Sequence, residues 1–599
     1  MTNALERVLG DSSMTKIWGP QTPECDAVHA SKYRQQGESF RAAMSRIASP
    51  LCDSDSHFAA FREILLEMRF MPAGRIQASI GATRVTTPYN CFVSGTIEDS
   101  FTKGHGSIMG RAEEAATTMR LGGGIGFDFS TLRPRGELIK TLDSQATGPV
   151  SFMPIYDAVG AATSSSGHRR GAEMGVLRVD HPDIEIFIHS KQNSTALTCF
   201  NISVAVTDEF MRAVEFDDNF TLQWNGKRYR EIRARDLWDS IMRSNYDWSE
   251  PGVLFIDTIN RMNNLYYCEE IAATNPCGEQ PLPPYGACLL GSINLPKYLF
   301  RSVLSSRWSF DFKQLHMDIP HIVRAMDNVI DYARYPLHEQ EQEAKRKRRM
   351  GLGVTGAANA IEAMGYPYGS DGFIHMLKSL LSSITNACYR ASALLAREKS
   401  PFPLYRKDAY CDSQFILSLD SSTQELIADH GIRNSHLTSI APTGTISFAA
   451  DNISSGIEPV FSYNQIRSIN GASGPYMVEI VDYGVKFLGI KGKTAAECSA
   501  EEHLKVIMAC APHIDSAVSK TLNVPKDTSW DEFKSIYFKA WKAQCKGCTT
   551  HRTGNFRGAV IVSADSQAEA ETVETPTPEP FSSDSSCLID PNTGKRDCS

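Results

Sequence analysis

The sequence predicts an α/β fold in which strands alternate with helices and form a barrel or a mixed sheet. Residues 199–206 and 252–256 are short apolar runs of the length and composition of buried strands. Residues 321–333 and 376–395 carry apolar side chains at helical spacing and separate such runs. The chain has 599 residues, of which 42% are hydrophobic and 22% are charged, so it can bury a large core.

The chain is expected to have four parts. Residues 1–70 alternate helical patterns with loops, and one helix is expected from 58 to 70. Residues 71–563 carry the alternating strands and helices of the main unit. Residues 564–586 are rich in Glu, Thr, Ser and Pro, so they cannot support a core and are expected to form a flexible linker. Residues 587–599 form a tail that carries two cysteines.

The composition disfavours several classes of protein. A formal net charge of −8 and a pI of about 6.0 give no support for direct binding to nucleic acid. The sequence shows neither a long apolar run nor a signal peptide, so a cytoplasmic protein without a membrane span is expected. Fifteen cysteines at irregular spacing do not suggest a disulfide scaffold. Those in ordinary apolar surroundings are expected to be buried structural thiols: Cys199, Cys388, Cys498 and Cys510.

Two cysteines eleven positions apart stand out by their local sequence. Cys277 lies in the run TNPCGEQ, with Asn275 and Glu279 two residues away on either side, and Cys288 lies in GACLLGSINL. Such a segment combines sulfur chemistry, hydrogen bonding and proton transfer. The second cysteine indicates that the sulfur chemistry involves electrons rather than acyl groups. A cysteine protease would need a histidine base beside the nucleophile, and the sequence does not place one there.

Together these runs resemble the active-site finger of ribonucleotide reductases. The resemblance implies a ten-stranded α/β barrel with a central finger loop and a small N-terminal helical region. It assigns a thiyl radical to Cys277, the base at the ribose 3′-hydroxyl to Glu279, and a hydrogen-bonding role to Asn275. Cys288 and Cys91, the latter in PYNCFV, would form the reducing pair. The substrate would be a ribonucleotide, either a diphosphate or a triphosphate.

The chemistry of ribose reduction explains why three sulfurs are required. One sulfur carries the radical, and two others give up electrons and become a disulfide. A buried disulfide must then be reduced in each turnover, which a bulky external protein cannot do directly. Cys587 and Cys598 in the tail are therefore expected to carry electrons inward by thiol–disulfide exchange. A thioredoxin- or glutaredoxin-like protein would supply those electrons.

Two further segments are expected to contact the substrate. The run SIAPTGTIS at 439–447 suits a strand followed by a turn that presents N–H groups at a helix start, which is an anion site, although an ordinary capped helix would look similar. The Gly-rich segment 121–130 lacks the context of a dinucleotide-binding fold, and the resemblance implies close approach of its backbone to the substrate. The substrate-binding residues implied are Asn90, Gly123, Gly124, Pro442, Thr443, Gly444, Thr445 and Ile446.

Polar, cationic loops at 132–136 and 164–175 resemble the loops through which a deoxynucleoside triphosphate effector selects the substrate base. The resemblance implies effector contacts from Asp99, Arg133, Arg169 and Arg170, although solvated surface loops have the same composition. Residues 1–55 are too few for an ATP-binding cone. We therefore expect control of specificity without an on–off switch. A homodimer or a monomer is expected.

The source of the radical is indicated by residues 545–552, CKGCTTHR. Oxygen-dependent reductases have paired tyrosines in the comparable stretch, whereas this run resembles the cobalamin-dependent, class II enzymes. Adenosylcobalamin is the cofactor implied, and no resident metal is expected. A class I large subunit that needs a metal-containing partner, or a silent nucleotide-binding homologue, remains as an alternative. Cys545 and Cys548 are read as structural thiols, with a redox or a zinc role left open.

Overall fold

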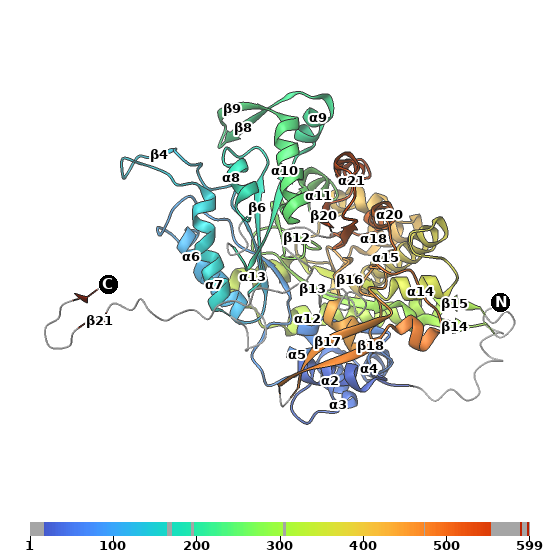
Figure 1. The fold of residues 1–599 in the computed structure, drawn as a ribbon. Helices are drawn as coiled ribbons and strands as arrows, with labels where there is room; N and C mark the ends of the chain where they lie inside the picture. The colour runs from blue at the N-terminus through green and yellow to red at the C-terminus, as the bar shows by residue number, and fades with distance from the viewer. Residues whose placement is uncertain are drawn as a thin grey trace. The chain divides into compact units, whose positions relative to one another are not determined.

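The computed structural model describes residues 17–163, 171–192, 197–302, 307–471, 474–552, 588–589 and 596–597, without the side chains of 467–476, 588–589 and 596–597. The chain divides into two compact units, Met1–Ala559 and Val560–Ser599. In the first unit, helices surround a large sheet (Figure 1). In the second unit, β21 (Leu588–Ile589) pairs with β22 (Arg596–Asp597).

A ten-stranded mixed sheet is the centre of the first unit. Five neighbouring strands, β2, β3, β6, β7 and β10, run parallel to one another. At one end β20 joins antiparallel to β10 and is followed by β19, and at the other end β13 joins antiparallel to β2 and carries β16. The strands are β1 (Phe70–Pro72), β2 (Cys91–Val93), β3 (Gly124–Asp128), β6 (Glu173–Arg178), β7 (Phe200–Val206), β10 (Gly252–Phe255), β13 (Ala287–Asn294), β16 (Met350–Thr355), β19 (Thr521–Val524) and β20 (Gly547–Arg552).

Two isolated bridges extend the sheet beyond β16. Leu352 in β16 bridges Thr438, and Ile440 bridges Val518, both in parallel. The amide of Leu352 donates to the Leu437 carbonyl over 2.8 Å. Val518 lies just before β19, which is the strand at the far end of the sheet. The segment around 438–440 thus lies between β16 and the residues that lead into β19.

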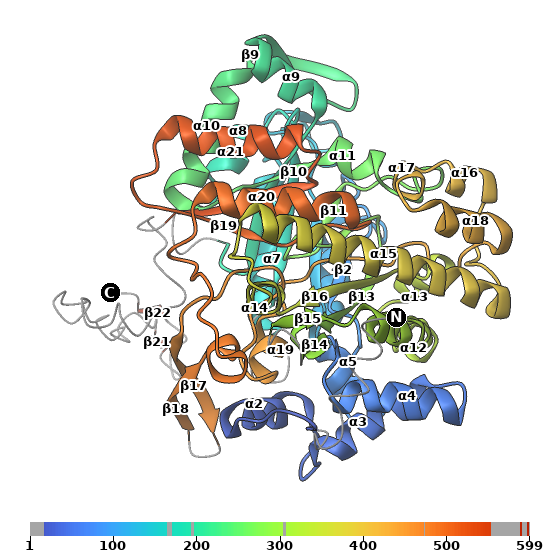
Figure 2. The same ribbon diagram turned by 90° about the vertical axis from the view of Figure 1, so that its right-hand side faces the viewer.

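Helices cover the sheet, and most residues of its five parallel strands are buried, as is usual for parallel strands. The two longest helices, α12 (Phe312–Tyr332) and α15 (Asp371–Lys399), pack against each other, and α15 lies with α20 and α21 over one side of the strands (Figure 2). The other helices of eight or more residues are α2 (Pro23–Tyr33), α3 (Phe40–Ala48), α4 (Asp55–Leu66), α6 (Ile108–Arg120), α7 (Met153–Ala162), α9 (Asp208–Phe216), α10 (Ala234–Trp248), α13 (His338–Lys347), α18 (Ser421–His430), α20 (Ala500–Cys510) and α21 (Trp530–Lys542).

Short elements complete the unit. The short helices are α5 (Gly74–Ser79), α8 (Ile184–His189), α11 (Ile256–Arg261), α14 (Ala357–Ala363), α16 (Lys407–Cys411), α17 (Gln414–Leu417) and α19 (Gly444–Ala449). The two-stranded sheets are β4 (Leu138–Ile139) with β5 (Ser144–Gln145), β8 (Asn219–Trp224) with β9 (Lys227–Arg233), β11 (Ala273–Thr274) with β12 (Pro281–Leu282), β14 (Leu299–Arg301) with β15 (Trp308–Phe310), and β17 (Asn464–Gly471) with β18 (Gly474–Val481).

The structure confirms the α/β class and the two expected strands, which are β7 and β10. The helices expected at 321–333 and 376–395 are present but longer, and α12 passes through Pro320. The helix expected at 58–70 is wrong at its end. It stops at Leu66, Met68 has φ 55°, and Phe70 begins β1, because the apolar residues there pair with β13. The four cysteines expected to be structural are buried: Cys199, Cys388, Cys498 and Cys510.

Within the described part of the chain, no helix is both long enough and apolar enough to cross a bilayer.

Candidate active site

Cys277 lies at the tip of a short hairpin, the finger, formed by β11, the loop 275–280 and β12. The loop closes on itself through Asn275, whose amide donates to the Gln280 carbonyl over 3.1 Å and whose Oδ1 accepts from the Gln280 amide over 2.9 Å. The Gly278 amide donates to the Asn275 carbonyl over 3.0 Å, and Gly278 has φ 79°, a conformation that favours glycine. The sequence NPCGEQ therefore holds Cys277 and Glu279 in a fixed loop.

Glycines in β3 allow the finger to cross the sheet. A β-carbon at Gly126 would lie 1.8 Å from the carbonyl oxygen of Thr274, and one at Gly124 would lie 3.0 Å from Cγ of Pro276. Asn201 in β7 secures the same point, because its Nδ2 donates to the Pro276 carbonyl over 2.9 Å. Gly124 and Gly126 of the Gly-rich segment thus allow the finger to pack closely against β3.

Cys91 and Cys288 are direct partners across the antiparallel strands β2 and β13. Such partners project to the same face of a sheet with α-carbons about 4.5–5.5 Å apart, within the span of about 4.4–6.8 Å that a disulfide bridges. Cys91 is 3% exposed and Cys288 is 0% exposed. Neither forms a disulfide in this structure. The pair can therefore be oxidised to a disulfide without a change of fold.

The finger brings its polar side chains onto this pair. Nδ2 of Asn275 donates to Sγ of Cys91 over 3.1 Å, and that thiol lies 3.7 Å from Oε1 of Glu279. Burial raises the pKa of Glu279, and burial, the Glu279 carboxylate and Cys277 raise the pKa of Cys91. Oε2 of Glu279 is buried without a hydrogen-bond partner among the described atoms. The structure thus brings together all five predicted catalytic residues, with one carboxylate oxygen left to accept a proton.

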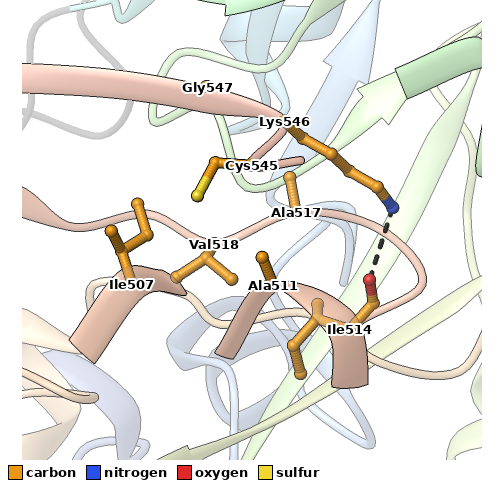
Figure 3. Close-up of a pocket in the computed structure, with 8 residues that line it drawn as sticks. All are labelled: Ile507, Ala511, Ile514, Ala517, Val518, Cys545, Lys546 and Gly547. Atoms are coloured by element: carbon orange, nitrogen blue, oxygen red, sulfur yellow. Dashed lines mark hydrogen bonds between the residues drawn. The ribbon is translucent and has the colours of Figure 1, made fainter. Parts of the chain in front are cut away.

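A lysine that the sequence analysis did not select, Lys546, supports the finger through the loop that includes Ile514 and Ala517, which Figure 3 shows beside it. The backbone carbonyl of Glu279 accepts from the Ala517 amide and from the Ser439 hydroxyl, each over 3.0 Å. The loop before Ala517 is held by Lys546, whose Nζ donates to the carbonyls of Ile514 over 3.3 Å, of Asp515, and of Ser516 over 2.5 Å. Burial lowers the pKa of Lys546 to about 8, and the Asp515 carboxylate opposes that shift. The one feature of the sequence that could have drawn attention to Lys546 is its position between Cys545 and Cys548.

Cys545 and Cys548 are buried, and burial raises the pKa of Cys545 to about 12. The cavity beside Cys545 in Figure 3 has a volume of about 10 Å³, which is room for about one water. It is therefore too small for a nucleotide. Among the residues with described positions, no group of three or more His, Cys, Asp or Glu side chains suits a metal ion. The burial of both thiols and the raised pKa of Cys545 favour structural thiols over reactive ones.

The expected anion loop has the predicted strand–turn–helix form. After the bridge at Ile440, Thr443 takes φ 53° and α19 begins at Gly444. Oγ1 of Thr443 accepts from the Gly456 amide over 2.7 Å and lies 3.0 Å from Oγ1 of Thr355. Pro442, Gly444 and Thr445 are exposed, Thr443 and Ile446 are buried, and a β-carbon at Gly444 would meet no atom within 4 Å. The hydrogen bonds of Thr443 therefore fix the turn, while Pro442, Gly444 and Thr445 face open space.

The remaining predicted substrate residues flank β2. The carbonyl of Asn90 accepts from the Gly124 amide over 2.9 Å, while its Oδ1 is buried without a hydrogen-bond partner in the described part. A β-carbon at Gly123 would lie 2.5 Å from the ring of Phe92. Gly123 therefore packs against the strand that carries Cys91, and the Asn90 amide oxygen is available to a ligand.

The predicted effector residues meet only in part. Nε of Arg133 donates to Oδ2 of Asp99 over 2.6 Å, and both side chains are about one quarter exposed, at 28% and 27%. Arg169 and Arg170 lie outside the described residues, as do Cys587 and Cys598. The expected loop 164–175 is too long at its end, because β6 begins at Glu173 and pairs with β3 and β7.

Comparison with known families gives a match over most of the chain. Residues 89–486 and 491–551 match the family described as "Ribonucleotide reductase, barrel domain". The chain belongs to the ribonucleotide reductase family. Its relatives in this family include a "Vitamin B12-dependent ribonucleoside-diphosphate reductase" of Mycobacterium tuberculosis, which is 37% identical over 84% of this chain and 73% of that protein.

Two further reductases extend the comparison. A "Vitamin B12-dependent ribonucleoside-diphosphate reductase" of Thermoplasma acidophilum is 32% identical over 90% of this chain and 70% of its own length. A "Vitamin B12-dependent ribonucleotide reductase" of Streptomyces clavuligerus is 26% identical over 87% of this chain and 62% of that protein. The matched barrel domain begins at residue 89 and so contains Cys91, the whole finger and Cys288.

Proposed function

We propose that this chain is an adenosylcobalamin-dependent ribonucleotide reductase that converts ribonucleotides to 2′-deoxyribonucleotides for DNA synthesis. The observation that carries the proposal is the buried cross-strand pair Cys91–Cys288, which lies against a finger that holds Cys277 and Glu279. Three sulfurs and a carboxylate in one site are what ribose reduction requires. The names of the relatives support cobalamin as the cofactor, and the names of two of them support a diphosphate substrate.

The residues divide the chemistry among them. Adenosylcobalamin, when bound, supplies the radical that passes to sulfur. Cys277 then removes hydrogen from C3′ of the ribose, while Glu279 accepts the 3′-hydroxyl proton. Cys91 and Cys288 give two electrons and two protons, so that the 2′-oxygen leaves as water and a disulfide forms. Cys277 finally returns its hydrogen to C3′. Asn275 holds Cys91 and the finger in place throughout.

The finger tip fits a large cofactor. Cys277 is exposed, whereas Cys91 and Cys288 are buried behind it. A β-carbon at Gly278 would meet no atom within 4 Å, so the space beside the tip is open. Cys277 and Gly278 would therefore lie against the cofactor. This arrangement also keeps the two electron-donating thiols away from it.

We also propose that the sheet closes into the ten-stranded barrel implied by the family. The bridges Leu352–Thr438 and Ile440–Val518 support closure, since they link β16 to the residues before β19. Pro442 to Ile446 would then bind the substrate phosphates at the end of one of these strands, with Asn90, Gly123 and Gly124 nearby. The open face of the turn at Gly444 supports this role.

The remaining assignments complete the proposal. A deoxynucleoside triphosphate effector would bind to Asp99, Arg133, Arg169 and Arg170. Its binding would select the base of the substrate allosterically. The linker at 564–586 would carry the two tail cysteines to the Cys91–Cys288 disulfide, with a thioredoxin- or glutaredoxin-like protein as the electron source. The same proposal includes domain divisions at 1–70, 71–563 and 587–599. It also includes a cytoplasmic location and a homodimeric or monomeric state.

The decisive experiment measures deoxynucleotide formation by the purified chain under anaerobic conditions. The mixture contains a dithiol and an effector deoxynucleotide, with ribonucleoside diphosphates or triphosphates, and adenosylcobalamin is present or absent. Product that forms only with the cofactor, and mainly from diphosphates, is the expected result. Product that requires a metal-containing partner subunit would favour the class I reading. Nucleotide binding without product under any condition would point to a silent homologue.

A further inference from the structure

Cys288 has a second neighbour on the edge of β13 away from Cys91. Strands β13 and β16 are parallel, and their first paired residues are Leu289 and Met350. The residues that precede this pair are Cys288 and Arg349, so Arg349 lies beside Cys288. Cys91 occupies the corresponding position on the other edge. Side chains at paired positions of neighbouring strands project to the same face. Cys91, Cys288 and Arg349 therefore form a row across β2, β13 and the start of β16.

Arg349 is fixed in this row. Its side chain is 2% exposed, and its Nη1 forms an ion pair with Oε1 of Glu343 over 2.7 Å. Glu269 holds the other end of the guanidinium. Lys347 shares both carboxylates, since its Nζ lies 2.8 Å from Oε2 of Glu269 and 2.8 Å from Oε1 of Glu343. This four-residue ion cluster keeps the arginine cation from turning away from the sheet.

The charges around the two sulfurs differ. Burial raises the pKa of both thiols. Arg349 opposes that effect at Cys288, where Asp515, Glu279 and Glu343 each act in the contrary direction and each more weakly than Arg349. At Cys91 the Glu279 carboxylate adds to the effect of burial, and the Asn275 amide opposes it. Because a fixed cation lies beside Cys288 and a carboxylate lies 3.7 Å from Cys91, a negative charge is favoured on Cys288 over Cys91.

We infer that Arg349 makes Cys288 the leaving sulfur when the Cys91–Cys288 disulfide is reduced, so that the incoming thiolate attacks Cys91. Arg349 is thus a positioning residue for the reductive half of the cycle. The inference rests on the proposed function, because it needs these two cysteines to form a disulfide.

The exchange balances in two steps. The first reductant thiolate forms a bond to Sγ of Cys91, the Cys91–Cys288 bond breaks, and Cys288 leaves as a thiolate beside Arg349. The second thiolate of the reductant then attacks the reductant sulfur that is bonded to Cys91. A disulfide forms within the reductant, and Cys91 leaves as a thiolate. Each cysteine then takes up one proton. The reductant is oxidised by two electrons and the enzyme disulfide is reduced by two.

Peptide mapping on the unmodified chain tests the direction of attack without substrate or cofactor. The protein is oxidised with diamide, its remaining thiols are blocked with iodoacetamide, and it then receives glutathione with deuterated iodoacetamide. Glutathione is expected on Cys91 and the deuterated label on Cys288, by about tenfold over the reverse, because the better stabilised thiolate leaves faster. Glutathione on Cys288, or on both cysteines equally, would overturn the inference.

Matched variants separate the charge of Arg349 from its place in the ion cluster. R349M is expected to lose the tenfold preference, and R349K to retain most of it. K347M removes a cation from the same two carboxylates and should leave the preference unchanged, whereas a purely structural role would make it behave like R349M. A folded R349M that keeps the full preference would overturn the role of Arg349. Should R349M not fold, the preference measured on the unmodified chain and on R349K decides whether the inference stands.

The oxidation step keeps the two proposals distinguishable. Peptides that show no Cys91–Cys288 disulfide after oxidation would overturn the proposed function and the inference with it. A disulfide that forms but opens in the opposite direction would overturn the inference alone.

Discussion

Gly126 lies where the sheet and the finger come closest, and replacing it tests how the finger is positioned. A β-carbon there would lie 1.8 Å from the Thr274 carbonyl oxygen, whereas carbon–oxygen contacts between strands settle at about 3.3 Å. Gly126→Ala therefore requires β11 to retreat by about 1.5 Å, the difference between these distances. A misplacement of about 1 Å can cost about 100-fold in rate, and overpacking costs about 1–3 kcal/mol. Because Cys277 follows β11 in the hairpin, turnover should fall by at least about 100-fold.

The assay compares kcat for deoxynucleotide formation, binding of the ribonucleotide by equilibrium dialysis, and unfolding in urea. Binding should fall much less than kcat, because the anion loop lies on another segment. Gly175→Ala in β6 is the matched control, since its β-carbon would meet the flexible end of Met153, Cε at 2.9 Å, rather than backbone. Turnover of Gly126→Ala within a few-fold of the unmodified protein, or an equal loss in the control, would refute the reasoning.

The remaining predictions concern the chemistry itself. Cys277→Ser should abolish turnover and leave nucleotide binding intact; appreciable deoxynucleotide from this variant would contradict the thiyl assignment. Since burial raises the pKa of Glu279, the rate should fall as the pH drops through that raised value and the carboxylate becomes protonated. Glu279→Gln should be slow at every pH, and a pH profile that still shows the acid limb would assign it to another group. Cys587→Ser combined with Cys598→Ser should lose activity with a protein reductant and keep it with a small dithiol. Equal activity with both reductants would rule out the shuttle.

Local sequence predicted much of the fold, because strand and helix patterns act over a few residues. The runs that became β7 and β10 are short and mainly apolar, and the pattern is sufficient for them. It failed at the end of α4, because Phe70 is apolar in a helix pattern and equally suited to pair with Ile293 in β13. The helix expected at 321–333 also begins earlier than its apolar spacing indicated, since α12 starts at Phe312.

The sequence by itself determined the chemical groups of the finger. Asn275, Cys277 and Glu279 lie within one loop, so their spacing is a local property of the chain and is readable without a fold. Tertiary structure alone decided what faces that loop. The pairing of Cys91 with Cys288 is a matter of strand register, which depends on how distant segments align in the sheet. For the same reason, only the folded chain places Arg349 beside Cys288 and Lys546 beneath the finger, because charge and burial are set by residues brought together from far along the sequence.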